Sequence, residues 1–227
     1  MNRHVCSERV EYEKLHARYG YGEKNEAGKK ALDYASAYEL AIINSYSRTR
    51  EEHYITYKRA ALTLVKEFNK YRLEILAIQE IRWSGQGSTE IGNTIIFFGQ
   101  CDNRRQGGTG FIVKKKITSA IKDLKVVNSR LTILIVEGKF FNIAFVNAHP
   151  PSEDKSDEEK EEFYSLLEST LEGIPRHCII ILLGDFNAKI GKEECFKTTT
   201  GSNSLHQLSN NNGFRLIELA TERGLKI

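Results

Sequence analysis

Six consecutive apolar residues, Cys178 to Leu183, run directly into Gly184, Asp185, Phe186 and Asn187. A continuous apolar run of this length is typical of a strand that is buried on both faces of an α/β sheet. In such sheets the functional side chains follow the carboxyl ends of the strands, where the chain leaves the core for a cleft. Alternation along an extended backbone predicts that Asp185 and Asn187 point to the same side and that Phe186 points into the packing. The run therefore predicts an α/β fold with a polar site at the end of this strand.

The rest of the chain mixes helices and strands. Apolar residues recur with helical spacing over residues 60–71, and a short buried strand is predicted directly afterwards at 73–79. Ser156, followed three positions later by Glu159, forms the capping-box pattern that begins a helix, and Gly173 ends that helix. The other predicted elements are strands at 94–98, 110–113, 131–136 and 140–146, a turn at 137–139, and a helix at 216–225. Strands with helices between them favour a layered α/β sandwich.

The composition fits one large α/β domain. The chain has 227 residues, of which 40% are hydrophobic, and a net charge of +3, which permits a nucleic-acid partner without demanding one. No apolar run is long enough to cross a membrane, and the first residues lack the apolar segment of a secretory signal. These features predict an intracellular protein, nuclear or cytoplasmic, without a membrane partner. The four cysteines (Cys6, Cys101, Cys178 and Cys195) lie far apart, which disfavours a zinc ribbon or a redox dithiol and predicts free thiols.

Two further predicted strand ends carry residues that suit the same chemistry. Glu80 ends one short apolar run, and His149 follows another. Together with Asp185 and Asn187, they would bind one hard divalent cation through carboxylate oxygen and place a phosphate and a water beside it. Mg²⁺, or Mn²⁺, suits such a site better than zinc. Taken singly, Glu80 also fits an exposed strand end, His149 a turn before two prolines, and Gly184 with Asp185 ordinary turn chemistry.

The first and last parts of the chain resemble each other. Residues 2–42 align without a gap on residues 187–227, at a constant offset of 185 positions. The identical pairs include Asn2/Asn187, Glu8/Glu193, Asn25/Asn210, Gly28/Gly213, Ala35/Ala220, Leu40/Leu225 and Ile42/Ile227. One explanation is that two unrelated helix–strand units share common residue preferences. The other is that the chain begins just inside one copy of a domain and ends just inside another.

Three segments, in this order along the chain, carry a resemblance to a known family. They are Ile-Gln-Glu-Ile-Arg-Trp (78–83), Asn-Ala-His-Pro-Pro (147–151) and Leu-Gly-Asp-Phe-Asn-Ala (183–188). They resemble the endonuclease/exonuclease/phosphatase superfamily, and in particular the apurinic-type endonuclease domain of non-LTR retrotransposons. The resemblance implies an incomplete four-layer α/β sandwich of the DNase I-like type with mixed β-sheets. Residues 1–58 resemble the later part of the same domain, which predicts a partial copy at 1–58 and the endonuclease-like domain at 59–227.

The chemistry that this resemblance implies is in-line hydrolysis of a phosphodiester bond, which nicks DNA. By the resemblance, Glu80 would ligate the catalytic Mg²⁺, and Asp185 would orient or deprotonate the attacking water. Asn187 would hold the scissile phosphate, and His149 would occupy a position that contacts a phosphate. The resemblance therefore gives each of the four strand-end residues a distinct role.

Three more residues are predicted to contact the substrate. Trp83 follows the Glu80 strand in a predicted loop near the site, and Arg104 with Arg105 forms a local basic cluster. Such groups suit contacts to the phosphates of DNA, the expected partner. A second basic cluster, Lys114–Lys116, is better explained as a solvated strand end.

The chain departs from the family pattern at both ends. The family begins with a strand that ends in a metal-site asparagine and finishes with an Asp-His pair, and the chain shows neither; His53 is not expected to replace that histidine. We therefore expect a truncated, rearranged enzyme with severely reduced or no nuclease activity, because losing a preorganised charge partner costs about 10²-fold or more in rate. Two alternatives stay open: a phosphatase of the same fold, and a non-catalytic remnant that binds nucleic acid or protein. The oligomeric state is also open.

Overall fold

The chain divides into two compact units, Met1–Leu73 and Glu74–Ile227. The structure is a computed structural model that describes residues 54–99 and 107–227. Helix α2 (Tyr54–Lys70), the described helix of the first unit, begins six residues before the predicted helix. The second unit contains both sheets and the other described helices. The predicted boundary between residues 58 and 59 separates two segments by the part of the family domain that each resembles. The boundary between the two compact units is a different property, so the predicted boundary stays a prediction.

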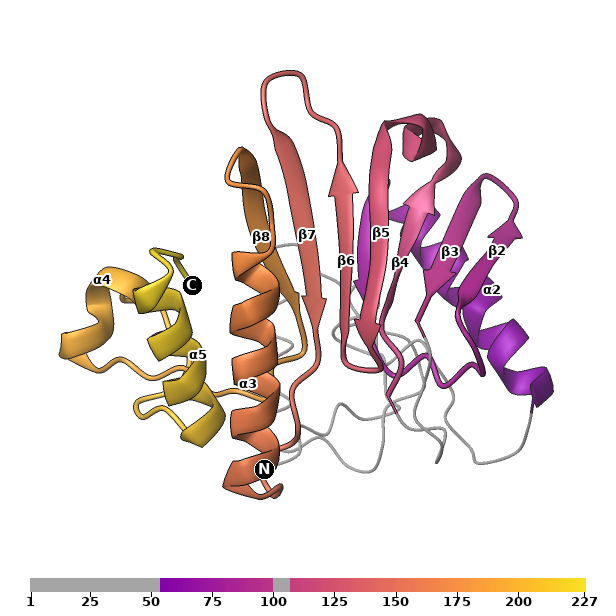
Figure 1. The fold of residues 1–227 in the computed structure, drawn as a ribbon. Coiled ribbons are helices and arrows are strands. Elements are labelled where there is room, and N and C mark those ends of the chain that lie inside the picture. The colour runs from indigo at the N-terminus through magenta and orange to yellow at the C-terminus, as the bar shows by residue number, and fades with distance from the viewer. Residues whose placement is uncertain (1–53, 100–106) are drawn as a thin grey trace. The chain divides into compact units, whose positions relative to one another are not determined.

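The first sheet of the second unit has four antiparallel strands in the order β1-β4-β3-β2 (Figure 1). The bounds are Ile75–Ile78 for β1, Gly87–Ile91 for β2, Thr94–Phe98 for β3 and Gly110–Lys114 for β4. Strands β1, β3 and β4 confirm the prediction to within two residues at each end. Strand β2 was not predicted, because Gly87, Ser88 and Glu90 are poor strand formers. It forms because β3, which follows after a two-residue turn, pairs with it along its whole length.

The second sheet is mixed, with the order β5-β6-β7-β8. The bounds are Ile121–Asn128 for β5, Leu131–Val136 for β6, Asn142–Ala148 for β7 and Cys178–Gly184 for β8. Strands β5, β6 and β7 are antiparallel, and β8 runs parallel to β7. The mixed sheets and the intervening helices confirm the predicted fold class. Strand β5 was missed because its exposed positions carry Lys122, Asp123 and Lys125, which lower its apparent strand propensity.

The environment predicted for β8 was wrong. The strand lies at the edge of the second sheet, and no described strand pairs with its other side. Ile179 is 51% exposed and Ile181 is 37% exposed, whereas Cys178, Ile180 and Leu182 on the opposite face pack against the core. Continuous apolarity shows that a strand is hydrophobic on both faces, but it does not show that both faces are covered.

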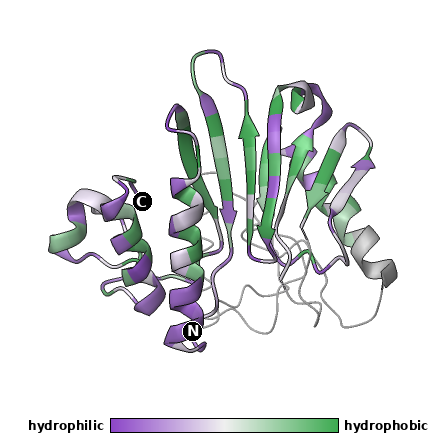
Figure 2. Ribbon diagram, in the orientation of Figure 1, coloured by the Kyte–Doolittle hydropathy of each residue, from purple (hydrophilic) through white to green (hydrophobic). Residues whose placement is uncertain are grey.

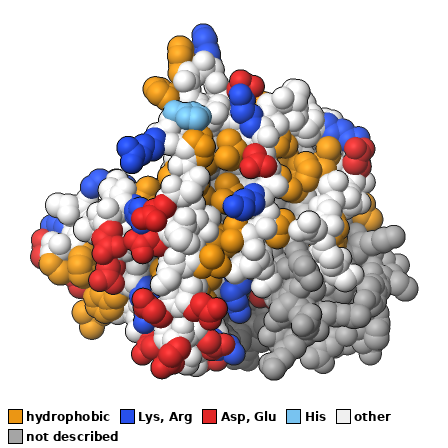
Figure 3. All heavy atoms as spheres, in the orientation of Figure 1, with side chains coloured by type: hydrophobic (Ala, Val, Ile, Leu, Met, Phe, Trp, Pro, Cys, Tyr) orange, Lys and Arg blue, Asp and Glu red, His pale blue; other side chains and the backbone are white. Residues whose placement is uncertain are grey.

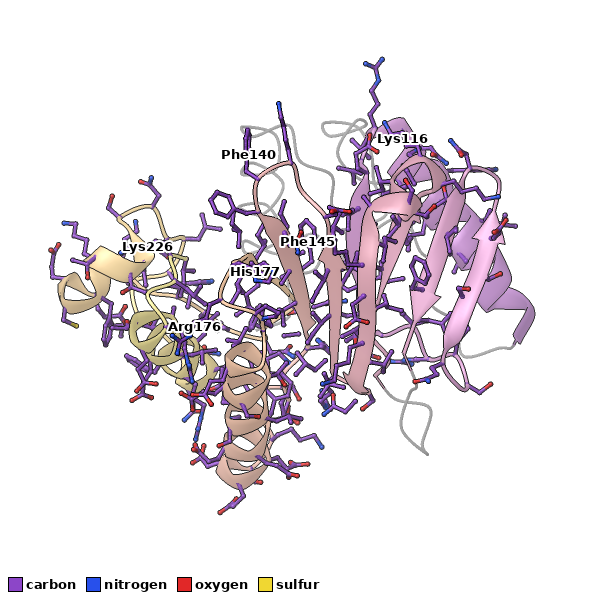
Figure 4. All side chains as sticks on the ribbon, turned by 45° about the horizontal axis from the view of Figure 1, so that its top comes forward. Lys116, Phe140, Phe145, Arg176, His177 and Lys226 are labelled. Carbon is purple, nitrogen blue, oxygen red and sulfur yellow. The ribbon has the colours of Figure 1, made fainter. Side chains whose placement is uncertain are left out.

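Two apolar clusters hold the second unit together. The first lies between the second sheet and the helices α3 (Asp157–Glu172) and α5 (Asn211–Glu222), with Leu131, Val146, Leu167 and Leu219 among its buried members (Figures 1 and 2). The second joins the two sheets through Phe111, Val113 and Leu134, with Phe145 packed against them. Phe140, in contrast, lies at the turn between β6 and β7 and is 80% exposed (Figure 4). Within this unit, helices α3 and α5, the second sheet and the first sheet therefore form three successive layers.

The helix ends follow local capping chemistry. The hydroxyl oxygen of Ser156 accepts a hydrogen bond from the Glu159 amide at 3.2 Å, which confirms the predicted start of α3, and Gly173 ends the helix as predicted. Helix α5 begins five residues earlier than predicted, because Asn210 caps it by accepting from the Gly213 amide at 2.8 Å. Three short helical turns complete the described elements: η2 (Lys115–Ala120), η3 (Glu194–Phe196) and α4 (Lys197–Thr200).

The structure explains the spacing Asn-x-x-Gly that the two similar segments share. In the described copy, Asn210 is the helix cap, and Gly213 lies so close to Lys189 that an added Cβ would be 2.0 Å from the Lys189 carbonyl oxygen. A side chain at position 213 would therefore push α5 away from the chain that follows β8. The matching residues Asn25 and Gly28 lie outside the described residues, so the relationship between the two segments stays a prediction.

The surface over α3 and α5 is strongly acidic (Figure 3). Two arginines of the α5 region bridge the helices: Arg223 contacts Glu168 at 2.8 Å and Glu172 at 2.7 Å, and Arg215 contacts Glu161. This face is therefore unsuited to the phosphates of DNA. None of the described helices is long and apolar enough to cross a membrane. Of the four cysteines, Cys178 and Cys195 lie in the described part of the chain, and both are free.

Candidate active site at the carboxyl ends of three strands

The four predicted strand-end residues, Glu80, His149, Asp185 and Asn187, lie where β1, β7 and β8 end. Strands β7 and β8 are parallel and finish side by side, with Ala148 opposite Gly184, so His149 and Asp185 leave the sheet at the same edge. Glu80 follows the end of β1 by two residues, in the other sheet. Its carboxylate oxygen Oε1 lies 3.2 Å from Nε2 of His149. The structure thus brings together residues that are 69 positions apart in the chain.

Both ring nitrogens of His149 face acceptors. Nδ1 lies 3.0 Å from the carbonyl oxygen of Asp185, and Nε2 faces the Glu80 carboxylate. A carbonyl and an ionised carboxylate only accept hydrogen bonds, so whichever ring nitrogen carries a hydrogen can donate to the partner that it faces. The ring is nearly inaccessible to water, because His149 as a whole is 8% exposed. His149 is therefore a buried link between the end of β1 and the end of β8.

Glu80 is held in its ionised form. The hydrogen bond from the His149 side chain, helped by Arg82, lowers the pKa of the Glu80 carboxyl from its ordinary value of 4.5 to about 2, against an opposing effect of burial. Arg82 donates from Nε to Oε2 at 2.9 Å, so each carboxylate oxygen has a basic partner. The backbone of Glu80 has a φ of +56°, a left-handed value that is uncommon for a residue with a side chain. Such strain at a strand end is often associated with function.

Asp185 and Asn187 do not continue β8 as an extended segment, and this part of the prediction was wrong. Strand β8 ends at Gly184, and Asn187 has a left-handed φ of +48°. The Asp185 carboxylate accepts from the Asn187 amide at 3.0 Å, while the Asn187 side chain donates from Nδ2 to the carbonyl of Pro150 at 3.0 Å. Phe186 packs against the core between them, as predicted. A tight turn, rather than strand alternation, thus places the two polar side chains.

Gly184 allows the turn to form beside β7. Its φ is +142°, and a Cβ added there would lie 1.8 Å from the carbonyl oxygen of Ala148. Only glycine lets the end of β8 approach the end of β7 this closely. The glycine therefore determines how near Asp185 comes to His149.

Two residues that were not predicted as site residues, Gln79 and Asn147, lie directly beneath the site. Asn147 is fully buried, and its side chain donates to the carbonyls of Ile78 at 2.9 Å and Gly110 at 2.8 Å. Its oxygen accepts from Nε2 of Gln79 at 2.6 Å. Both residues stand inside the motifs at 78–83 and 147–151. The signal for Gln79 was a polar residue within the predicted strand at 73–79, whereas Asn147 lies one residue beyond the predicted strand at 140–146 and within the observed β7.

The loop after His149 is tied to the start of α5. Glu153 places its carboxylate at the helix N-terminus, where it accepts from the Asn211 amide at 3.1 Å and from the side chain of Asn210 at 2.8 Å. Asn212 is fully buried and donates to the carbonyl of Pro151 at 2.9 Å. The Asn187 carbonyl accepts from the side chains of both Asn210 and Asn212 at 3.3 and 3.4 Å. Helix α5 thus supports the turn that carries Asn187.

The predicted substrate contacts have mixed outcomes. Trp83 is partly buried, with its ring edge-on to Phe98 at a centroid distance of 4.9 Å, and its role stays a prediction. Arg104 and Arg105 lie outside the described residues. In the cluster Lys114–Lys116, Lys115 pairs with Glu90 at 2.6 Å and Lys116 pairs with Glu74 at 2.7 Å. This cluster lies at the opposite end of β4 from Gly110 and the site, which agrees with a solvated strand end.

The site offers few ligands to a metal ion. Within residues 54–99 and 107–227, no group of three or more His, Cys, Asp or Glu side chains is arranged to hold one. Glu80 is nevertheless a hard oxygen donor whose side chain is 42% exposed. Mg²⁺ retains several waters and needs only one or two carboxylates together with substrate phosphates. The donor set therefore fits Mg²⁺ or Mn²⁺ at Glu80, provided that Arg82 and His149 release its oxygens.

The fold and the site agree with the class of protein that the three sequence motifs indicate. Two packed sheets bring together a carboxylate, an imidazole and an Asp-x-Asn turn at their strand ends. Residues 44–221 match the model of the endonuclease/exonuclease/phosphatase family, and the chain belongs to that family.

Within the family, the chain is similar to craniofacial development protein 2. It is 29% identical to the protein of Bos taurus over 90% of this chain and 36% of the relative, and 30% identical to that of Tragulus javanicus over 73% of this chain and 29% of the relative. The chain thus spans about a third of the length of these relatives. A solved structure, the endonuclease domain of the telomere-specific non-LTR retrotransposon TRAS1, is 12% identical with a TM-score of 0.45, covering 70% of this chain and 64% of that one.

Proposed function

We propose that this chain is a metal-dependent phosphodiesterase domain, derived from a retroelement, that nicks DNA with low activity. The observation that supports the proposal most is the meeting of Glu80, His149 and the Asp185–Asn187 turn at one edge, through the Glu80–His149 contact of 3.2 Å and the His149–Asp185 contact of 3.0 Å. Family membership supports hydrolysis as the reaction class. DNA as the substrate, and Mg²⁺ or Mn²⁺ as the cofactor, are parts of the proposal.

Each residue has a role that its surroundings allow. Glu80 would hold the divalent cation, which supplies charge stabilisation for the phosphate in the transition state. Asp185 has an exposed carboxylate that can accept a proton from a water molecule. Asn187 uses one side-chain N–H on the Pro150 carbonyl, which leaves the second N–H to donate to a phosphate oxygen. His149 can donate to a phosphate only after its contact with Glu80 opens.

We propose low activity because the negative charge of the Glu80 carboxylate already has partners within the protein. Both of its oxygens contact cationic or donating groups, Arg82 at 2.9 Å and His149 at 3.2 Å. A cation that binds Glu80 must compete with both partners, which weakens its apparent affinity. We therefore expect activity only at high concentrations of Mg²⁺ or Mn²⁺.

The test is nicking of supercoiled plasmid by the full chain, with and without an abasic site, in Mg²⁺, in Mn²⁺ and in EDTA. Asp185→Ala removes the proposed base and should lower the rate by about 10²-fold or more. Asp123→Ala, which removes an exposed carboxylate on β5 in a different part of the unit, is the matched control and should leave the rate unchanged.

Each outcome of this test selects one function. Metal-dependent nicking that is lost in Asp185→Ala supports the proposal. Salt-dependent DNA binding without cleavage would select the non-catalytic remnant, because phosphate contacts alone give affinity that falls with salt. Release of phosphate from an inositol polyphosphate, without DNA nicking, would select the phosphatase.

A further inference from the structure

The side chain of Asn147 joins the two sheets directly beneath the candidate site. Asn147 belongs to β7 in the second sheet, and its Nδ2 donates to the carbonyls of Ile78 in β1 and Gly110 in β4, at 2.9 and 2.8 Å. Ile78 and Gly110 are partners in the first sheet, so one amide group contacts the end of the β1–β4 ladder on both strands. The residue has no exposed surface. A hydrogen bond of this kind between two sheets is stronger when water is excluded.

Gln79 completes this arrangement from the other side. Its Nε2 donates to Oδ1 of Asn147 at 2.6 Å. The orientation of the Asn147 amide is unambiguous, because the Ile78 and Gly110 carbonyls can only accept and must face the NH₂ group. An aspartate or a leucine at position 147 could not make the same contacts. We refer to Asn147 and Gln79 as the inter-sheet amide pair.

The amide pair is adjacent in sequence to the two residues whose contact forms the site. Glu80 follows Gln79 directly, and His149 follows Asn147 by two positions. The backbone on both sides is also fixed: the Ile81 amide donates to the Gly108 carbonyl at 3.1 Å, and the His149 amide donates to the Arg130 carbonyl at 2.9 Å. The distance between Glu80 and His149 therefore depends on how the ends of β1 and β7 are aligned, and the amide pair sets that alignment.

We propose that Asn147 and Gln79 are positioning residues that hold Glu80 and His149 in contact across the two sheets and so determine the affinity of the Glu80 site for a divalent cation. Neither residue touches the substrate or the cation in this assignment. The part of this proposal that concerns cation affinity rests on the proposed function. The part that concerns the contact between Glu80 and His149 does not.

The first experiment measures Mn²⁺ binding by the full chain, from the electron paramagnetic resonance signal of free Mn²⁺. Asn147→Leu keeps the approximate volume but removes all three hydrogen bonds, and we expect its affinity for Mn²⁺ to rise by about fivefold, because the Glu80–His149 contact that competes with the cation is loosened. Gln79→Met removes only the Gln79 contact, should fold even where Asn147→Leu does not, and is expected to raise the affinity by a smaller factor, about threefold.

A matched control separates positioning from general stability. Thr132, which pairs with Asn147 along β6 and β7, links the second sheet to the residue that precedes β4, because its hydroxyl lies 2.7 Å from the hydroxyl of Thr109 and both residues are buried. Thr132→Val removes this contact without touching the backbone next to Glu80. We expect Thr132→Val to lower the stability to urea but to leave Mn²⁺ affinity within about twofold of the parent protein. Equal Mn²⁺ affinity in Asn147→Leu, Gln79→Met and the parent would overturn the inference.

The second experiment needs no metal, so that failure of the proposed function can be told apart from failure of this inference. A double-mutant cycle with Glu80→Gln and His149→Gln measures their coupling as a ratio of unfolding constants in urea, expected to be about fivefold for a partly exposed pair. In an Asn147→Leu or Gln79→Met background the coupling should fall below about twofold, and in Thr132→Val it should persist. No Mn²⁺ binding by the parent would count against the proposed function alone, whereas coupling that survives loss of the amide pair, or is absent from the parent, would overturn this inference.

Discussion

Protonating Glu80 should weaken the fold, because His149 and Arg82 hold this carboxyl in its ionised form. The hydrogen bond from His149 is the largest cause, and the pKa of Glu80 lies at about 2 instead of 4.5. A pKa that is lower in the folded state stabilises the protein at pH values above the ordinary pKa. This contribution should therefore be complete above about pH 5 and should disappear as the pH falls towards 2.

The expected size follows from the same values. Each pKa unit of difference between the folded and unfolded states corresponds to about 1.4 kcal/mol, which gives a ceiling of about 3.4 kcal/mol for Glu80. The side chain is 42% exposed, however, and water screens such contacts strongly. We therefore expect a contribution of about 1 kcal/mol to the free energy of unfolding at pH 7.

The assay is urea unfolding of the parent protein and of Glu80→Gln, from pH 7 down to pH 2.5. The difference between the two free energies of unfolding should be about 1 kcal/mol at pH 7 and should shrink steadily below pH 4.5. Glu90→Gln, which removes another exposed carboxylate that pairs with a lysine, corrects for the general effect of losing a surface charge. His149→Gln should flatten the pH dependence, since His149 is the main cause. A difference that stays constant from pH 7 to pH 2.5 would refute the reasoning.

Two further substitutions test the packing around the site by urea unfolding. Gly184→Ala should lower the free energy of unfolding by at least about 3 kcal/mol, because the new Cβ would lie 1.8 Å from the Ala148 carbonyl oxygen. Gly85→Ala, at a φ of +74° but with nothing within 4 Å, should cost only about 1 kcal/mol, and equal losses in the two variants would count against the clash. Tyr164→Phe should cost about 1 kcal/mol, because the buried hydroxyl donates to the Asn212 carbonyl at 3.2 Å; unchanged stability would show that this bond contributes nothing.

The family and its motifs could be recognised from the sequence because their signals are local. The apolar run before Asp185 predicted a strand that ends at a polar site, and β8 does end one residue before Asp185. Ser156 and Glu159 predicted the start of α3, since a cap depends only on residues three positions apart. Periodicity likewise located β3 and β6 without error.

The arrangement of the site could not be read from the same patterns. Asp185 and Asn187 were expected on an extended segment, but the left-handed φ of Asn187 turns the chain, and contacts from Asn210 and Asn212 hold that turn. Strand alternation gives the direction of side chains only while the backbone stays extended. A turn held by residues more than 20 positions away leaves no trace in the local pattern.

The sequence by itself determined where the candidate site residues lie along the chain: the apolar runs placed Glu80, His149 and Asp185 at strand ends, because burial imposes a period on every strand. Only the tertiary structure decided how these ends meet. It placed β8 at a sheet edge, paired Glu80 with His149 across 69 positions, and linked the two sheets by the hydrogen bonds of Asn147. The physical reason is that hydrogen bonds between buried polar groups depend on distances within about 3 Å, and these are set by the packing of whole sheets rather than by neighbours in the chain.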